Sequence, residues 1–250
     1  MRSLVLLLAA AAVLLARVPA GAEVTLDEAV CETKASLAAW KFVAAKTGCL
    51  VSCQRGVRAG SIDPSTCVPP YPPSPTFGCI QGKEGRANGR ICSGCNPDAP
   101  ECYPEVCPDT TNELLTQVDE PFFGSFLPAV YCDDSGSADG LTALEGKCQD
   151  TVAKYVVRYA YYHARCYAKC RLSEAKGLLA AGSCEPPASD PATQACVAKY
   201  SLATELRIDR YCAAPYGNAP ECHGEATGYT WTVFGSLIVD GFVPTFYCEN

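Results

Sequence analysis

The sequence contains an internal repeat that is defined by cysteines. Six cysteines of the first half recur 117 residues later, with the same gaps of 18, 4, 14, 12 and 16 residues between neighbours. The two sets are Cys31, Cys49, Cys53, Cys67, Cys79 and Cys95, and Cys148, Cys166, Cys170, Cys184, Cys196 and Cys212. A fixed period without insertions is the signature of repeated structural units. The sequence therefore predicts two modules of one design, with cysteines at equivalent positions.

A second group of cysteines matches between the halves after the register slips. Pro-Glu-Cys and Tyr-Cys sequences recur in both halves, and their cysteines are Cys102 and Cys132, then Cys222 and Cys248. The first half also has two cysteines without a counterpart, Cys92 and Cys107. We expect these two to bond to each other.

Residues 135–140 form a polar, glycine-bearing stretch that is typical of a linker. They divide the chain into a first module at residues 23–134 and a second at residues 141–250. Each module carries its own cysteine set and its own capped helix, so we expect residues 141–250 to fold alone.

Residues 1–22 have the pattern of a secretory signal peptide. A basic residue, Arg2, precedes an apolar run and the small residues Ala20-Gly21-Ala22. The run is too short for a bilayer span, so we expect cleavage and no stable membrane span afterwards. All 18 cysteines follow this segment, and a dense, even set in an exported chain is typical of disulfides. We expect a secreted or periplasmic protein with no free thiol.

The chain is acidic, with 20 Lys and Arg against 27 Asp and Glu and a net charge of −7. Loss of Arg2 and Arg17 with the signal peptide would make the charge more negative still. An acidic surface repels nucleic-acid phosphates and anionic lipid headgroups. The composition therefore argues against nucleic acid as a partner and leaves another exported or cell-surface protein.

Each module is predicted to begin with a long helix. The segments Thr25–Glu28 and Thr142–Glu145 fit capping boxes, in which threonine and glutamate satisfy each other's backbone amides. One helical face then runs through Cys31–Cys53 and is small, while its equivalent through Cys148–Cys170 is bulky. A bulky and a small stripe interdigitate well, so we expect the modules to contact each other.

A second helix is clearest in the second module, from Val197 to about Arg210. Its counterpart in the first module contains four glycines, each of which costs about 0.5–1 kcal/mol relative to alanine. They are Gly82, Gly85, Gly89 and Gly94. We therefore expect this element to be frayed, and the basic, glycine-rich stretch at residues 82–90 to be a mobile loop. It lacks the Gly-Lys-Ser/Thr sequence of a P-loop.

Antiparallel packing of the two helices in a module predicts a nested set of disulfides. Helix lengths at 1.5 Å per residue bring the inner cysteines together and then the outer ones. The expected pairs are Cys31–Cys95, Cys49–Cys79, Cys53–Cys67 and Cys102–Cys132, then Cys148–Cys212, Cys166–Cys196, Cys170–Cys184 and Cys222–Cys248. Many other pairings exist, and this one is the most economical.

The C-terminal part of each module is apolar and aromatic. Residues 229–239 and 242–247, separated by Asp240-Gly241, fit a short β-hairpin. The predicted fold class is therefore mainly α: two tandem, disulfide-stapled helical hairpins, each with an irregular or short β C-terminal segment.

The Ala- and Lys-rich stretches at Lys41–Lys46 and Cys166–Cys170, with their flanking cysteines, resemble the repeats of uncharacterised secreted cysteine-rich proteins in bacterial genomes. The resemblance covers the first helix of each module, about a third of the chain. It implies an envelope or exported location and no catalytic residue.

Catalytic and metal-binding patterns are sparse in the sequence. His163 and His223 are the only histidines, and we expect the first to be a surface or packing residue and the second a loop residue. The Cys92-Ser93-Gly94-Cys95 sequence lacks a thioredoxin-like setting, a second zinc-ligand pair and a following histidine for haem. We therefore expect no catalytic residue, no metal, no cofactor and no enzymatic activity.

A basic stripe leaves one question of function open. Lys154, Arg158, Arg165 and Lys169 share a helix flank, and Lys41 aligns with Arg158 in the repeat. Such a stripe is either a solvated helix face or a dock for an acidic partner.

An aromatic face offers another reading. Tyr155, Tyr159 and Tyr162, together with Phe42 and Trp40, would suit a small apolar or aromatic ligand held between helices. We favour an exported, non-enzymatic protein with a structural or protein-binding role. A carrier of such a ligand is the alternative, and a secreted enzyme of another type is a third.

Overall fold

The computed structural model describes residues 25–69, 71–95, 109–132, 141–213 and 217–247. These residues are mainly helical, and none of them belongs to a strand. The mainly α class predicted from the sequence is therefore confirmed. The expected signal peptide at residues 1–22 and the linker at residues 135–140 lie outside the described residues.

Two long helices of 33 residues each form the centre of the molecule, α1 (Leu26–Arg58) and α5 (Ala143–Ala175). Both begin with the predicted capping box. The threonine hydroxyl accepts a hydrogen bond from the N–H of the glutamate, whose carboxylate accepts one from the threonine N–H. These bonds satisfy amides that the first turn of a helix would leave without a partner.

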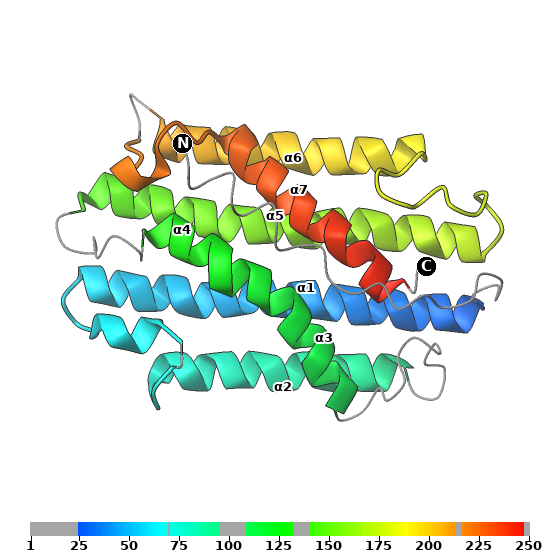
Figure 1. Cartoon of the computed structure of the whole chain (residues 1–250), viewed down its shortest axis with the longest axis horizontal. Coiled ribbons are helices and arrows are strands. Elements are labelled where there is room, and N and C mark those ends of the chain that lie inside the picture. Colours follow the sequence, from blue (N-terminus) through cyan, green and yellow to red (C-terminus); the bar gives the residue numbers. More distant parts are fainter. Residues whose placement is uncertain (1–24, 70, 96–108, 133–140, 214–216, 248–250) are drawn as a thin grey trace.

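Four helices lie side by side in one layer, in the order α2 (Pro75–Cys95), α1, α5 and α6 (Pro191–Cys212) (Figure 1). Neighbouring helices run antiparallel, and contacts join α2 to α1, α1 to α5, and α5 to α6. The two halves therefore contact each other, as expected. The two cysteine-bearing stripes do not form this contact, because their cysteines are bonded to α2 and α6.

Two further helical segments cross one side of this layer diagonally (Figure 1). The first comprises α3 (Asp109–Glu120), a π-helical stretch (Pro121–Phe126) and α4 (Leu127–Tyr131), and the second is α7 (Gly228–Phe246). The first contacts α1, α2 and α5, and the second contacts α6, α5 and α1. We call this the covered side. On the opposite, open side, the described residues place no helix.

The core lies between the layer and the diagonal segments. Trp40 of α1 is 1% exposed, and its ring packs edge-to-face against Phe122 and Phe242 at centroid distances of 5.7 and 6.2 Å. Phe126 stacks on Phe234 at 5.4 Å. Aromatic pairs of this geometry contribute beyond the area they bury. Residues from both halves therefore build one core.

Six of the predicted disulfides are confirmed, and they repeat from half to half. In each half the bonded cysteines are 64, 30 and 14 residues apart. The confirmed pairs are Cys31–Cys95, Cys49–Cys79, Cys53–Cys67, Cys148–Cys212, Cys166–Cys196 and Cys170–Cys184. The two wider pairs join the helices of a hairpin, and the third closes the turn between them.

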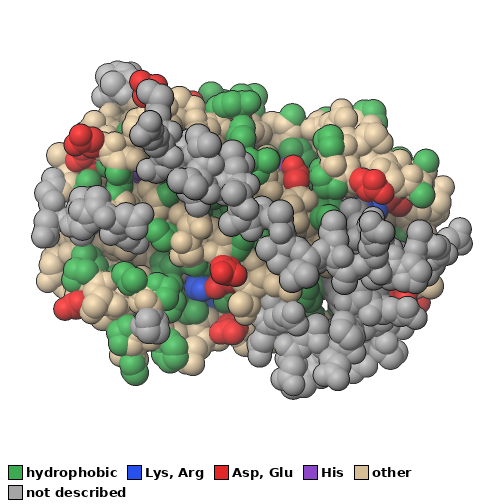
Figure 2. Space-filling view, viewed as in Figure 1, with side chains coloured by type: hydrophobic (Ala, Val, Ile, Leu, Met, Phe, Trp, Pro, Cys, Tyr) green, Lys and Arg blue, Asp and Glu red, His purple; other side chains and the backbone are tan. Residues whose placement is uncertain are grey.

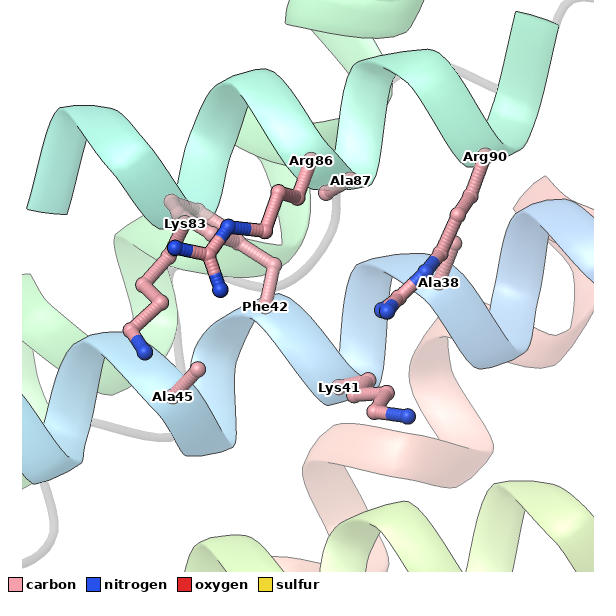
Figure 3. A pocket seen from close by; sticks show the side chains of 8 residues that line it. All are labelled: Ala38, Lys41, Phe42, Ala45, Lys83, Arg86, Ala87 and Arg90. Atoms are coloured by element: carbon pink, nitrogen blue, oxygen red, sulfur yellow. The ribbon is translucent and has the colours of Figure 1, made fainter.

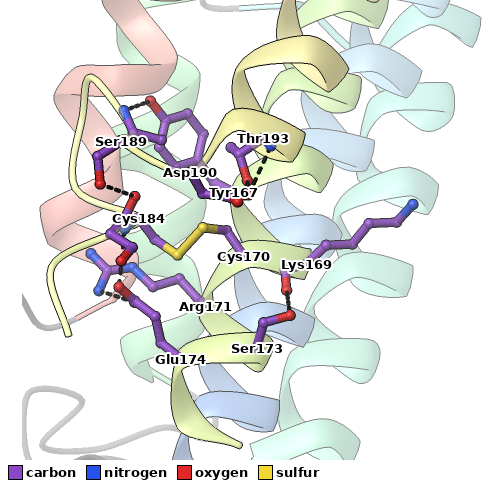
Figure 4. Close-up of a disulfide and its surroundings, with 12 residues drawn as sticks. Tyr167, Lys169, Cys170, Arg171, Ser173, Glu174, Cys184, Ser189, Asp190 and Thr193 are labelled. Carbon is purple, nitrogen blue, oxygen red and sulfur yellow. Dashed lines mark hydrogen bonds and ion pairs between the residues drawn. A yellow bond between two sulfur atoms is a disulfide. The ribbon is translucent and has the colours of Figure 1, made fainter. Parts of the chain in front are cut away.

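The turn after α5 shows how a disulfide of this kind is set among polar contacts (Figure 4). Cys170 is bonded to Cys184, whose N–H donates a hydrogen bond to Glu174 over 3.0 Å. Glu174 also binds the guanidinium of Arg171 at 3.0 Å. The connection to α6 is thus fixed by a covalent bond and by charged hydrogen bonds together.

The rest of the disulfide scheme needs correction. Cys132 is bonded to Cys222, in place of the expected pairs Cys102–Cys132 and Cys222–Cys248. Cys132 ends α4 over α5, and the short turn Glu221–His223 lies against it, with His223 Nε2 2.8 Å from the carbonyl oxygen of Val130. The bond therefore links the two halves, which a search for pairs within each module could not find.

The remaining pair involves residues beyond those described. Cys92 is disulfide-bonded, while Cys107, its expected partner, lies outside the described residues, as do Cys102 and Cys248. Among the described residues no cysteine is free.

The expectation of a frayed second helix in the first half is wrong. α2 is continuous over 21 residues. Ile80, Ala87 and Ile91 are buried against α1, and the disulfides at Cys79 and Cys95 hold the helix at both ends. This packing outweighs the propensity cost of the glycines.

The predicted C-terminal hairpin is also wrong, because residues 228–246 form the helix α7. Its buried residues recur with helical spacing, and they include Thr232, Gly235, Val239, Val243 and Phe246. β-Branched and aromatic residues favour strands only weakly, and tertiary packing overrides that preference here.

Candidate anion-binding site

A pocket of about 120 Å³ lies between α1 and α2 (Figure 3). Four of its lining residues come from each helix, at the same spacing of three, one and three positions. They are Ala38, Lys41, Phe42 and Ala45 on α1, and Lys83, Arg86, Ala87 and Arg90 on α2. This spacing keeps each set on one helix face. We call it the basic pocket.

The basic pocket is lined by small side chains and by long cationic ones. Ala38, Ala45 and Ala87 leave space between the helices where larger residues would close it. Figure 3 shows the long cationic side chains around this space. The lining therefore combines a small apolar floor with four positive groups.

The charge of the lining is entirely positive, although the chain as a whole carries −7. The ion pairs found among the described residues use none of its four cations. Like charges repel when they are held close together, and an anion between them removes that cost. Arginine and lysine donors also form strong charge-assisted hydrogen bonds with carboxylate or phosphate oxygens.

The equivalent groove between α5 and α6 is filled. The repeat places Tyr162 where the first half has Ala45, and Tyr200 where it has Lys83. These two rings stack at a centroid distance of 4.4 Å with an interplanar angle of 4°. Arg158 donates a hydrogen bond to the Tyr162 hydroxyl over 3.3 Å. The two equivalent grooves therefore differ: tyrosines close the groove between α5 and α6, whereas the groove between α1 and α2 is open and basic.

The sequence-predicted aromatic face does not form one site. Trp40 and Tyr159 are each 1% exposed in the core, and Tyr159 shares a hydrogen bond of 2.6 Å with Ser236 of α7. Tyr155 and Tyr162 are half-buried, and Tyr162 faces Tyr200. Phe42 lines the basic pocket. The five residues are therefore spread over the core and two grooves.

Each long helix also holds one buried basic residue at the same repeat position. Lys46 forms an ion pair with Asp119 and lies 4.0 Å from the centroid of the Phe123 ring. Its counterpart His163 has Nε2 3.1 Å from an Asp240 oxygen. Burial raises the pKa of Asp119. These pairs tie α1 and α5 to the diagonal segments, so His163 is a packing residue.

Two acids of the long helices are buried, and neither was predicted from the sequence. Asp150 of α5 binds Arg55 and Arg58 of α1 at 2.6 and 2.7 Å. Glu32 of α1 is 2% exposed, and burial raises its pKa to about 8, although the charge of Arg171 of α5 opposes this shift. Each acid lies one or two residues after a core cysteine, Cys31 or Cys148, and this is the signal that could have revealed them.

His223 is the other histidine of the chain. It is buried in the turn beside the Cys132–Cys222 bond, and burial lowers its pKa. The three side chains place their potential ligand atoms within 4.8 Å of one another. A metal would need the sulfurs as thiolates, and in the structure they are bonded to each other.

The chain matches no known protein family, no curated protein and no solved structure. In the described part of the chain, every helix is too short or too polar to cross a membrane.

Proposed function

We propose that this chain is an exported, non-enzymatic binding protein, and that its basic pocket holds an anionic group presented by an exported or cell-surface partner. The observation that carries the proposal is the pocket lined by Lys41, Lys83, Arg86 and Arg90 with no acid among them. A binding role also fits the lining, which holds no carboxylate, imidazole, hydroxyl or thiol.

Export is supported by several features together. They are the signal-like residues 1–22, the seven disulfides of the described residues and the resemblance to secreted cysteine-rich repeats. Such bonds persist in oxidising compartments. In this proposal the chain consists of two tandem modules, residues 23–134 and 141–250. The first module has the basic pocket, and tyrosines close the equivalent groove of the second.

The repeat provides a matched pair of variants for the test. Arg90 lines the pocket, and Arg207 occupies the same repeat position beside the tyrosine-filled groove. Pyrophosphate serves as a compact polyanionic probe, with binding measured by isothermal titration calorimetry at low salt. We expect Arg90→Ala to weaken binding about tenfold, because one charge-assisted contact is lost. Arg207→Ala should bind as the natural protein does.

Two results would contradict the proposal. One is that pyrophosphate does not bind the natural protein at millimolar concentration. The other is that Arg90→Ala and Arg207→Ala weaken binding equally, because the anion would then be attracted by overall charge. Circular dichroism of both variants ensures that the comparison concerns folded protein.

A further inference from the structure

The open side of the layer presents the outer stripes of α1 and α5. α1 is flanked by α2 and α5, and α5 by α1 and α6, while the diagonal segments pack on the covered side. The exposed residues of both helices must therefore point to the remaining side. The repeat register agrees, since Lys41 and Arg158 are equivalent and both exposed.

The exposed residues of these stripes are almost all cations. Between Cys148 and Cys170, every exposed residue of α5 is a lysine or arginine. Between Cys31 and Cys53, the exposed residues of α1 are two lysines and Ser52. The cations are Lys34, Lys41, Lys154, Arg158, Arg165 and Lys169. We call these six residues the basic face, and Lys41 joins it to the basic pocket.

Acids of the flanking helices lie toward the covered side instead. Glu205 accepts a hydrogen bond from Thr232 of α7 at 3.1 Å, and Asp209 accepts one from the N–H of Gly228 at 2.7 Å. Figure 2 views the covered side and shows acidic side chains at several places on it. These acids of α6 and the cations of the basic face therefore lie on opposite sides of the layer.

Tyrosines lie among the cations of this surface. The Arg158 guanidinium is 5.5 Å from the centroid of the half-buried Tyr162 ring, and Tyr162 stacks on Tyr200. Tyr155 and Tyr161 are also half-buried. Such rings offer flat apolar faces with a polar edge, which suit the faces of sugar rings.

We propose that the basic face binds an anionic polysaccharide that lies along α5 and α1 and places one acidic group in the basic pocket. The proposal rests on the anion binding proposed above. Lys154 to Lys169 alone spans about 22 Å at 1.5 Å per residue, so a chain of several acidic sugars can meet successive cations. A lipid surface fits less well, because no large exposed aliphatic side chain lies between the cysteines of either stripe.

The test uses the full chain and polygalacturonate, with binding measured by biolayer interferometry. We expect salt-sensitive binding, no binding of neutral dextran, and a loss of about tenfold in affinity for the triple variant Arg158→Gln, Arg165→Gln, Lys169→Gln. Lys176→Gln, beyond the end of α5, is the control and should bind normally. Circular dichroism checks that the triple variant is folded.

The possible results distinguish the polysaccharide proposal from the proposal that the basic pocket binds an anion. If the triple variant binds polygalacturonate normally while Arg90→Ala loses pyrophosphate, the pocket stands and the extended face is wrong. If phosphatidylglycerol vesicles or single-stranded DNA bind as tightly as polygalacturonate, the assignment to polysaccharide is overturned. If neither pyrophosphate nor polygalacturonate binds, both proposals fall.

Discussion

Glu32 is a buried carboxylic acid at a position where the other half of the repeat carries Gln149, which is also buried. Burial raises the pKa of Glu32 to about 8, from 4.5 in an unfolded chain. The folded protein therefore keeps the proton that the unfolded chain loses. The stability linked to this proton is fully present below pH 4.5 and is lost as the pH rises through 8.

We expect Glu32→Gln to remove this pH dependence, because glutamine is neutral at every pH. The variant should match the natural protein near pH 5 and be more stable at pH 8.5, by on the order of 2–5 kcal/mol. Denaturant unfolding at pH 5, 7 and 8.5 measures the difference. A difference that stays constant across this range would show that Glu32 does not titrate as described.

Tyr159 tests packing at a second residue. It is 1% exposed, and its neighbour Arg158 points to the open side. Tyr159→Ala removes a buried aromatic ring and the hydrogen bond to Ser236, so we expect a loss of about 3–5 kcal/mol in unfolding free energy. Arg158→Ala should change it by less than about 0.5 kcal/mol. Thermal unfolding measures both variants. If the two substitutions lowered the unfolding free energy equally, Tyr159 would not be buried as described.

At the scale of elements, the glycines of the helices differ in what surrounds them. A Cβ added at Gly85 of α2 would meet nothing within 4 Å, whereas one at Gly235 of α7 would lie 3.2 Å from both Tyr159 and Val156. We expect Gly85→Ala to stabilise the protein by about 0.5–1 kcal/mol through helix propensity. Gly235→Ala should destabilise it, because α7 must move away from α5.

Chemical denaturation of both variants measures these opposite signs. Stabilisation by Gly235→Ala would mean that α7 crosses α5 less closely than described. Destabilisation by Gly85→Ala would mean that the exposed glycine side of α2 is in contact with another part of the chain.

Some elements could be predicted from the sequence because local signals and packing agree. α1 and α5 have capping boxes and a helical stripe, and tertiary packing uses that stripe. α7 could not be predicted, since its β-branched and aromatic residues favour a strand while its buried positions repeat with helical spacing. The basic pocket could not be predicted either, because the glycine-rich stretch was expected to be a loop. Lys83, Arg86 and Arg90 share one side only if this stretch is a helix.

At the scale of the whole molecule, the net charge does not describe how the charges are distributed. A chain of −7 is expected to repel polyanions, yet the six exposed cations of the basic face lie along α1 and α5 on one side. A local field acts on a ligand within about a Debye length, which is about 8 Å at physiological salt. An average over the surface cannot show such a separation, which depends on the fold.

The two halves share a core, and this changes the expectation that residues 141–250 fold alone. The core cluster contains residues of both α1 and α5, such as Ala39 and Val156. In the second half alone, Asp150 would lose Arg55 and Arg58, and Cys222 would lose Cys132. A buried charge that loses its partners costs about 3–5 kcal/mol, and exposed apolar area adds to this.

We therefore expect residues 141–250, after oxidative refolding, to be helical but to lack cooperative unfolding. Far-UV and near-UV circular dichroism through a thermal scan distinguish the two properties, and the full chain is the control. Addition of residues 23–134 in trans should restore part of the cooperativity if the α1–α5 contact is what is missing. A sharp transition in the isolated half, with native disulfides confirmed by peptide mapping, would show instead that each half is a domain in its own right.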